Sequence, residues 1–490
     1  MKEIILDNFL KMNPQAPEYS QKNTNYLISG ADPLYYLNDN SQEEQVAPLS
    51  ASIDWKQITA TIQGNIVHMV SGVGGTYTAY AITDTTKVYG ITTSSVVDLG
   101  YPTGSSVGNI AGYLVIGGNS LYATFGSAGT VYYMPLSSGA WSSFGSINSA
   151  VGTHFTEQFA DHIAIADGTV AYTQANLVKL IDPTTGTPTI LTTPLLNVGL
   201  GFGILQMRNF NDKYLAVAVG KVGSGGGEVG YPQNYIYLWD GALDTFNYSV
   251  KVPGKFIDMK VVNSTLYVAV QVSNGKTCIY YLSGTQLKKV FTTQISTINT
   301  SVGQHRPATF CVLFDFKNYL GVKLSNTPDL TVPILVYGKD EVGGLEFIYS
   351  SGRIFDQFVV DYNGVLFANE YVSGGNSNLY YLPTTGTYQT ILYRSQWIPV
   401  NNLQSLDIFY NSLPVSGTDA INVTIYGRGE DIITGTSTTV LDSITPTNYL
   451  NAERTRLDCK GFTGDKVKIE LSTVNSTWKP NIRKIKLITA

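Results

Sequence analysis

Short apolar runs, each ending in a polar turn, repeat along most of the chain. Residues 263–284 read NSTLYVAVQVSNGKTCIYYLSG, in which two apolar, aromatic-edged runs flank the turn SNGKT. Two such runs around a polar turn predict a β-hairpin. The 3.6-residue apolar period with caps that predicts helical repeats is absent from this pattern. We therefore expect an all-β protein.

Copies of this hairpin recur at near-constant spacing. They start 42 to 53 residues apart, counted between the markers Tyr77, Leu121, Ile163, Tyr214, Leu266, Tyr319 and Leu366. In several copies another strand precedes the hairpin and a shorter run follows it, so the repeating unit is a four-stranded antiparallel sheet. Radial stacking of such sheets into a β-propeller fits this unit length. We place seven blades between about residue 56 and residue 393, with six as the alternative because the third copy is short and irregular.

The two ends of the chain follow other patterns. Residues 394–490 alternate with period two in segments such as KVKIELSTV (466–474), which predicts a separate β-sandwich of jelly-roll type. Residues 1–55 are polar, interrupted by proline and poor in periodicity. We expect them to form an extended arm that packs over its own propeller or onto a neighbouring subunit.

The composition narrows the class of protein. Charged residues make up 14% of the 490 residues, against about 25% in an average soluble domain. Surfaces built for assembly are depleted in Lys and Glu, and the 33 tyrosines fit the same class. The net charge of −5 gives no basic footprint for specific nucleic-acid binding. No apolar stretch approaches the length of a membrane span, and the opening apolar run is too short for a signal peptide.

The residues that could carry chemistry do not form a recognised site. The three cysteines are far apart, which predicts reduced thiols in a reducing cytosol. The glycines of 220–230 lack the Gly-Lys-Ser/Thr ending of a phosphate loop. A sialidase Asp-box is missing, and the arginines are scattered along the chain. We expect no enzyme activity, no cofactor and no bound metal. The candidates considered for metal binding were His154, Glu157, Asp161 and His162, and those considered for glycoside hydrolysis were Asp258, Asp356 and Asp361.

The layout of the chain resembles a class of tailed-bacteriophage virion proteins. The resemblance rests on the opening EIILDNFLKMNPQAP, the polar arm, the strand beginning LYRSQWIPV and the ending KPNIRKIKLITA. That ending follows the pattern P-x-I-x-x-I-x-L at Pro480, Ile482, Ile485 and Leu487. The resemblance implies a structural subunit of a tail nozzle, tail tip or fibre-attachment ring. Such a protein is made in the host cytoplasm, ends in the virion tail, and contacts other virion proteins and copies of itself in a six- or twelve-fold ring.

Two segments are candidates for the contacts between subunits. Tyrosines and acidic residues of the arm offer contact area, and the C-terminal domain is the basic end of a weakly acidic molecule. In the alternative, the arm packs back on its own propeller and the basic face is solvated. The arm candidates are Tyr19, Tyr26, Tyr35, Tyr36, Glu43 and Glu44, and the basic candidates are Arg454, Arg456, Lys460, Lys466, Lys468, Arg483, Lys484 and Lys486.

Other function classes remain open at this point. A lectin-like propeller that binds a host receptor or glycan would use exposed aromatic residues at loop tips, such as Tyr231 or Tyr371. A glycan hydrolase would need a channel carboxylate whose loss abolishes activity.

Overall fold

The computed structural model describes strands, turns and bends, and its described residues contain no helix. The all-β prediction is confirmed, and most of the sheets are antiparallel and four-stranded. No described segment forms a helix long and apolar enough to cross a membrane. The described residues are 2–6, 25–29, 49–50, 54–104, 112–126, 128–168, 175–184, 187–199, 201–221, 233–272, 276–296, 311–316, 319–324, 333–337, 347–350, 355–372, 376–383, 386, 388, 390–395, 397–411, 418–428, 437–440, 453–459, 466–474 and 478–490.

The chain divides into two compact units. We call Lys56–Val332 with Arg353–Tyr381 the ring unit. The other, which we call the sandwich unit, comprises Met1–Trp55, Pro333–Gly352 and Leu382–Ala490.

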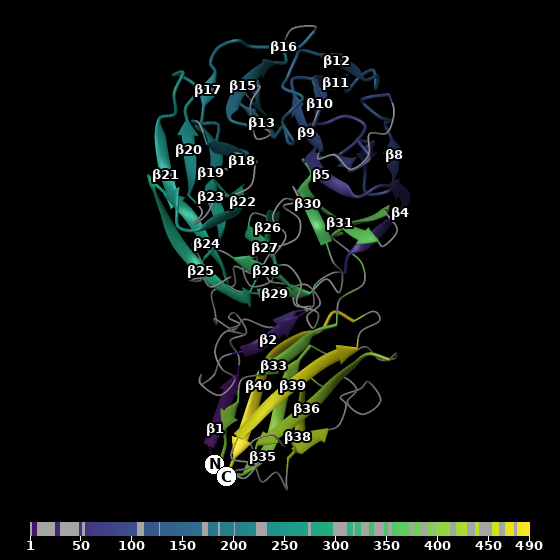
Figure 1. Cartoon of the computed structure of the whole chain (residues 1–490). Coiled ribbons are helices and arrows are strands. Elements are labelled where there is room, and N and C mark those ends of the chain that lie inside the picture. The colour runs from purple at the N-terminus through teal and green to yellow at the C-terminus, as the bar shows by residue number, and fades with distance from the viewer. Residues whose placement is uncertain are drawn as a thin grey trace. The chain divides into compact units, whose positions relative to one another are not determined.

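The ring unit is built on innermost strands that follow one another in a closed circle (Figure 1). Each innermost strand contacts the next one along the chain, and the last of them, β30, contacts the first, β5. The innermost strands are β5 (Ile66–Ser71), β9 (Gly112–Gly117), β13 (Thr156–Phe159), β18 (Phe202–Phe210), β22 (Lys255–Val262), β26 (Cys311–Phe316) and β30 (Phe355–Val360).

Antiparallel strands extend each sheet outward from its innermost strand. The sheet of β5 adds β6 (Ala79–Thr83), β7 (Val88–Ile91) and β8 (Val96–Asp98). The sheet of β9 adds β10 (Ser120–Phe125), β11 (Val131–Pro135) and β12 (Ser142–Phe144). The sheet of β13 adds β14 (His162–Asp167), β15 (Leu177–Asp182), β16 (Thr189–Ile190) and β17 (Leu196–Asn197). The next two add β19 (Tyr214–Lys221), β20 (Asn234–Trp239) and β21 (Tyr248–Val252), and β23 (Thr265–Gln271), β24 (Lys276–Ser283) and β25 (Gln286–Ser296). In the next sheet of the ring unit, β26 pairs with β27 (Tyr319–Leu324). In the sandwich unit, β28 (Pro333–Tyr337) pairs with β29 (Phe347–Ser350).

The second strand of a sheet is buried on both of its faces. All five residues of β6 are buried, as are six consecutive residues of β19. Strands covered on both sides read as continuous apolar runs instead of alternating ones, because neither face meets water. This is why the repeated hairpin starts with unbroken runs such as LYVAV (266–270).

The last sheet of the ring combines strands from both ends of the ring unit. β30, β31 (Leu366–Val372) and β32 (Asn376–Tyr381) are followed outward by β4 (Lys56–Gln63), which comes from the start of the unit. β4 pairs antiparallel with β32, and its inward residues Ile58 and Ile62 are buried. Directly after β4, the backbone N–H of Ile66 donates a hydrogen bond of 3.0 Å to Ser377 Oγ of β32.

Apart from the β28–β29 pair, the described strands of the sandwich unit form two sheets that share one apolar core. The first sheet has the order β1 (Lys2–Leu6), β40 (Asn481–Thr489), β35 (Leu403–Tyr410) and β38 (Arg454–Asp458), with β3 (Leu49–Ser50) also pairing with β40. The second has the order β2 (Asn25–Ser29), β33 (Leu392–Ser395), β39 (Lys466–Val474), β36 (Ala420–Arg428) and β37 (Ser437–Val440), with β34 (Ile398–Pro399) also on β39.

The placement of the N-terminal segment differs from the expectation of an arm lying on the propeller or on a neighbour. Its strands β1 and β2 instead lie in the two sheets of the sandwich unit (Figure 1), and β3 pairs with β40 of the same unit. The sequence KEIIL explains β1, because Leu6 is buried in the sandwich core and Ile4 packs against it, while Glu3 and Ile5 are exposed. The sequence alone does not predict this strand, because an alternation of five residues is short and the sequence that follows it is polar and contains proline.

We predict that the ring depends on the strand that closes it. Ile62→Ala removes a side chain that is 1% exposed, so it should lower the free energy of unfolding by about 2–5 kcal/mol. The measurement is the denaturant midpoint of the ring unit, with exposed Gln63→Ala as the control on the same strand. Equal midpoints for the two variants would show that β4 does not hold the ring closed.

Candidate functional site

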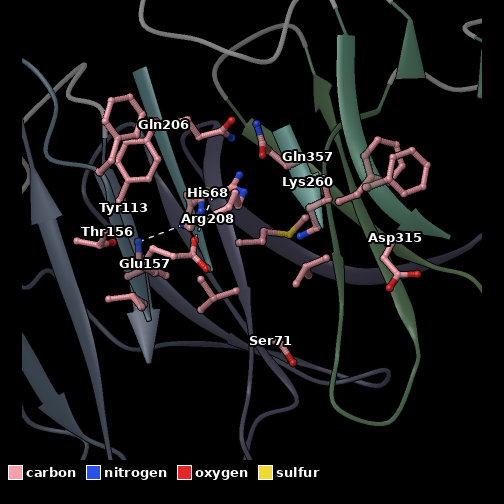
Figure 2. A pocket seen from close by; sticks show the side chains of 18 of the residues that line it. His68, Ser71, Tyr113, Thr156, Glu157, Gln206, Arg208, Lys260, Asp315 and Gln357 are labelled. Carbon is pink, nitrogen blue, oxygen red and sulfur yellow. Dashed lines mark hydrogen bonds and ion pairs between the residues drawn. The ribbon is translucent and has the colours of Figure 1, made fainter. Parts of the chain in front are cut away.

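A cavity of about 490 Å³ lies at the centre of the ring unit, and residues of every innermost strand line it (Figure 2). We call it the channel. Its walls carry both apolar and ionisable side chains, and Glu157, His68 and Arg208 lie close together with Lys260 beside them.

The strand register places three charged residues at one level of the channel. Glu157 pairs with Ala164, Arg208 with Ala216 and Lys260 with Tyr267. Each of these partners is the third residue of the second strand of its sheet (β14, β19 or β23). Because β13, β18 and β22 are successive innermost strands, the three charges follow one another around the channel wall.

The Arg208 side chain is held by two kinds of acceptor. Its Nη1 lies 3.4 Å from Glu157 Oε2 on the preceding sheet. Its Nε donates to the Met259 carbonyl at 3.1 Å on the following sheet, and Nη1 also donates to the Met207 carbonyl at 3.0 Å. Arg208 therefore ties three successive sheets together at the channel wall.

A second set of polar residues, two residues earlier on each strand, links neighbouring sheets. His68, Gln206 and Asp258 each follow an irregularity in strand register, and a β-bulge of this kind redirects the side chain that follows it. His68 Nδ1 accepts from the Leu114 backbone N–H, and Gln206 Oε1 accepts from the Met259 N–H. In both cases the side chain satisfies a backbone donor on the innermost strand of the next sheet.

Asp258 makes the most complete of these links. Its Oδ1 accepts from Gln206 Nε2 and from the Met259 N–H, and its Oδ2 accepts from the Leu313 N–H, each at 2.8 Å. Burial raises the pKa of this carboxyl, and Arg208 and the donated hydrogen bonds oppose that shift. Both carboxylate oxygens of Asp258 therefore accept hydrogen bonds from other residues of the ring unit.

Burial also controls the two basic groups that line the cavity near Arg208. It lowers the pKa of His68 to about 3, helped by the positive charges of Arg208 and Lys260, so the imidazole is neutral at physiological pH. The pKa of Lys260 is lowered by burial first and by Arg208 second. Nearby Glu157, Asp258 and Asp315 act in the opposite direction on Lys260. Burial therefore disfavours the charge on Lys260, and these three carboxylates offset part of that effect.

The structure separates the residues considered as metal ligands. His154 is fully buried, and its Nδ1 donates to the Ala166 carbonyl at 2.8 Å, whereas Glu157 lies in the channel against Arg208. Asp161 is exposed at a turn and His162 is only partly buried at the start of β14. Within the described ranges, no group of three or more His, Cys, Asp or Glu residues is placed to hold a metal ion.

Sequence reasoning did not find the charged level of the channel. In the sequence Arg208 is one of several scattered arginines, and no motif marks Lys260. A signal was present, because Glu157, Arg208 and Lys260 each stand six residues before a hairpin marker, namely Ile163, Tyr214 and Leu266. Equal offset from the marker means equal height in neighbouring sheets, apart from bulges.

Much of the basic cluster of the sandwich unit is neutralised within the chain. Arg454 and Arg456 both bind Asp407, whose side chain is fully buried, and Lys486 Nζ lies 2.6 Å from Glu3 Oε1. Arg483 pairs with Glu453 at 3.1 Å. Lys484 lies over the Phe409 ring and Lys468 over the Trp397 and Tyr426 rings, and Lys466 opens β39.

The arm candidates cannot be placed in the same way. Tyr26 belongs to β2, and its side chain lies outside the described residues. Tyr19, Tyr35, Tyr36, Glu43, Glu44 and Lys460 also lie outside them, as does Tyr231.

We predict that Asp258 is needed for the stability of the ring. Asp258→Ala leaves the Gln206 amide N–H and the Leu313 N–H without their acceptor and leaves the Met259 N–H with Gln206 Oε1 alone, which should cost about 3 kcal/mol or more. Denaturant unfolding of the full chain measures this loss, with exposed Asp244→Ala as the control. A loss no larger than that of the control would contradict the role assigned to these links.

We also predict an acid-sensitive contribution from Asp407. The hydrogen bond from Arg456 is the main cause of its lowered pKa, and Arg454 adds to it. A lowered folded-state pKa gives stability that is present above the ordinary carboxyl pKa and lost as pH falls through the folded value. Asp407→Asn should therefore lower the unfolding midpoint at pH 7 and reduce the difference between pH 7 and pH 3. If this difference stays as large as in an Asp244→Asn control, the pair does not stabilise the unit.

Comparisons with known proteins give only distant likenesses. No protein-family model matches the chain, and no curated protein sequence matches it. Among solved structures, "YCF48 bound to D1 peptide" is 9% identical with a TM-score of 0.43, covering 68% of this chain and 98% of that one. A streptogramin B lyase structure is 10% identical with a TM-score of 0.39, covering 68% and 97%. A Trypanosoma rangeli sialidase in complex with sialic acid is 9% identical with a TM-score of 0.33, covering 90% and 96%. These likenesses assign no function to the chain.

Proposed function

We propose that this chain is a structural subunit of a bacteriophage tail, of the nozzle, tail-tip or fibre-attachment type, that acts by assembly and not by catalysis. In this proposal the ring unit is a seven-bladed β-propeller, one blade for each innermost strand. The two sheets of the sandwich unit form a jelly-roll-like domain. The partners are further copies of the chain and other virion proteins.

The observation that carries the proposal concerns the two segments in which the resemblance to phage virion proteins is strongest. The opening segment forms β1 and the ending forms β40, and the two pair directly, from Lys2↔Thr489 to Leu6↔Ile485. The motif residues Ile482, Ile485 and Leu487 are all fully buried in the sandwich core. The resemblance therefore rests on residues that act together in one sheet.

This pairing also gives the proposal a mechanism of assembly. β1 is an edge strand, held by one row of backbone hydrogen bonds, a single buried leucine and the Lys486–Glu3 ion pair. An identical β40 on a neighbouring subunit offers the same row of partners. Exchange of an identical element between protomers needs no new surface, so it is an economical way to join copies in a ring.

A disulfide across the β1–β40 register tests where β1 binds. Ile5 and Lys486 are opposite each other, so Ile5→Cys with Lys486→Cys places two thiols on paired residues. If β1 crosses between subunits, oxidation of the assembled protein should give a ladder of covalent multimers on a non-reducing gel. The matched control is Ile5→Cys alone, which accounts for disulfides with the native cysteines. A product that stays at monomer mass with the double variant would show that β1 binds its own β40.

Removal of the arm tests whether it is needed for assembly at all. Deleting residues 2–45 removes β1 and β2 and should leave the ring unit folded, because that unit begins at Lys56. We expect the truncated chain to be monomeric by light scattering under conditions in which the full chain forms rings. If the truncated chain forms rings as readily as the full chain, the arm is not the contact that joins the subunits.

A further inference from the structure

One arc of the channel wall is aromatic. It belongs to the level two residues before that of Glu157, Arg208 and Lys260. Strand pairing gives the residues at this height as His68, Tyr113, Phe155, Gln206, Asp258, Val312 and Gln357, and all seven line the same cavity. The ring centroids of His68 and Tyr113 are 5.0 Å apart, and those of Tyr113 and Phe155 are 4.9 Å apart. We call these three rings, on successive innermost strands, the aromatic arc.

The aromatic arc is both accessible and held in place. Each of its three residues is only partly buried, so the rings keep surface toward the cavity that they line. His68 and Tyr113 lie beside each other (Figure 2), and the Leu114 N–H holds the imidazole through Nδ1. Contact with the imidazole on one side and Phe155 on the other then orients the Tyr113 ring. Rings that are fixed before binding lose little conformational entropy when a ligand packs on them.

Two uncharged polar groups adjoin the arc and are available to a ligand. Within the described part of the chain, neither the Tyr113 hydroxyl nor the side-chain amide of Gln357 has a hydrogen-bond partner, although both side chains line the cavity. Gln357 belongs to β30, which contacts β5, so its amide stands next to the His68 end of the arc. The hydroxyl can donate and accept, and the amide offers both a carbonyl oxygen and an NH2 group. Gln206 and Asp258, on the other side of this level, are already used in the hydrogen bonds between sheets.

The ionisable groups of the cavity favour a ligand without net charge. The carboxylates of the lining are Glu157, Asp258 and Asp315, and its cations are Arg208 and Lys260. An anion would therefore meet more negative than positive charge, and a cation would meet the guanidinium and ammonium groups. A neutral polar molecule avoids both repulsions, and its removal from water costs less free energy than that of an ion.

The size and chemistry of the wall narrow the class of neutral ligand. A volume of about 490 Å³ falls within the range of about 300–1,000 Å³ in which proteins bind small molecules. The faces of aromatic rings carry partial negative charge, which attracts the C–H groups on one face of a sugar ring. Sugar hydroxyls both donate and accept hydrogen bonds, as the Tyr113 hydroxyl and the Gln357 amide require. A flat apolar molecule would cover the rings and leave these two polar groups unpaired, which costs free energy.

We propose that the channel binds one neutral pyranose sugar, with its C–H face packed on the aromatic arc and its hydroxyl groups hydrogen-bonded to Tyr113 and Gln357. A free monosaccharide and the terminal sugar of a glycan present this same chemistry. The site belongs to the ring unit alone and is independent of how the subunits assemble.

Isothermal titration calorimetry of the full chain with the methyl glycosides of glucose, galactose and mannose tests this site. We expect at least one of them to bind in the millimolar range. The uronate of the same sugar differs by a carboxylate and should bind more weakly, because the lining holds more carboxylates than cations. A disaccharide that ends in the preferred sugar separates the two sources. Equal or tighter binding than the methyl glycoside indicates a glycan end, and weaker binding indicates a free monosaccharide.

Two variants test the hydroxyl and the aromatic face separately. Tyr113→Phe removes the hydroxyl and keeps the ring, so the affinity for the preferred glycoside should fall about threefold or more. Phe155→Leu keeps an apolar side chain and removes one aromatic face, and a loss of about threefold or more is expected from it as well. Tyr248→Phe, at an exposed tyrosine of β21, is the matched control and should leave binding unchanged.

Three results would each overturn the proposal. The first is no binding of any of the glycosides at about 10 mM. The second is tighter binding of benzoate, choline or uridine than of every glycoside, which would assign the cavity to an anion, a cation or a nucleoside. The third is an unchanged affinity in both Tyr113→Phe and Phe155→Leu. If Phe155→Leu does not fold, Tyr113→Leu takes its place with the same expected loss.

Discussion

The pairing of β4 with β32 is the contact on which the ring unit depends. Each second strand is apolar on both faces and is buried only because a sheet lies on either side of it. An open row of such sheets would expose the outer face of its first and last members to water. β4 prevents this because it carries the start of the ring unit into the last sheet, so both ends meet in one set of backbone hydrogen bonds.

Closure of the ring also creates the site at its centre. Once the innermost strands form a circle, residues at equal height on neighbouring strands become neighbours around the channel, however far apart they are in sequence. The side chains after the strand irregularities bridge from one sheet to the backbone of the next, as His68 and Asp258 do. The polar groups that make these hydrogen bonds between sheets are not free to bind a ligand. Glu157, Arg208, Lys260 and Asp315 line the same cavity, so the channel wall carries both acidic and basic groups.

The local pattern of the sequence predicted the hairpins and the all-β class, because strand burial and turn residues are set by neighbours along the chain. It did not predict that Glu157, Arg208 and Lys260 line one level of the channel, since their placement depends on the register of three separate sheets. Nor did it place KEIIL in the sandwich, because the partner of β1 is β40, at the far end of the chain. In both cases the deciding arrangement joins residues distant in sequence, and the trace of it for the three charged residues is their equal offset from the hairpin markers.

We propose that the chain is a structural part of a phage tail, in which its two terminal strands pair in one sheet and its closed ring unit serves as a rigid scaffold. The most direct test is an electron cryomicroscopy reconstruction of the virus particles produced by the genome that encodes this chain. The account predicts a ring of six or twelve copies in the tail, with density for the paired β1 and β40 strands in every copy. Particles that lack the chain, or that carry it as isolated single copies away from the tail, would contradict the claim.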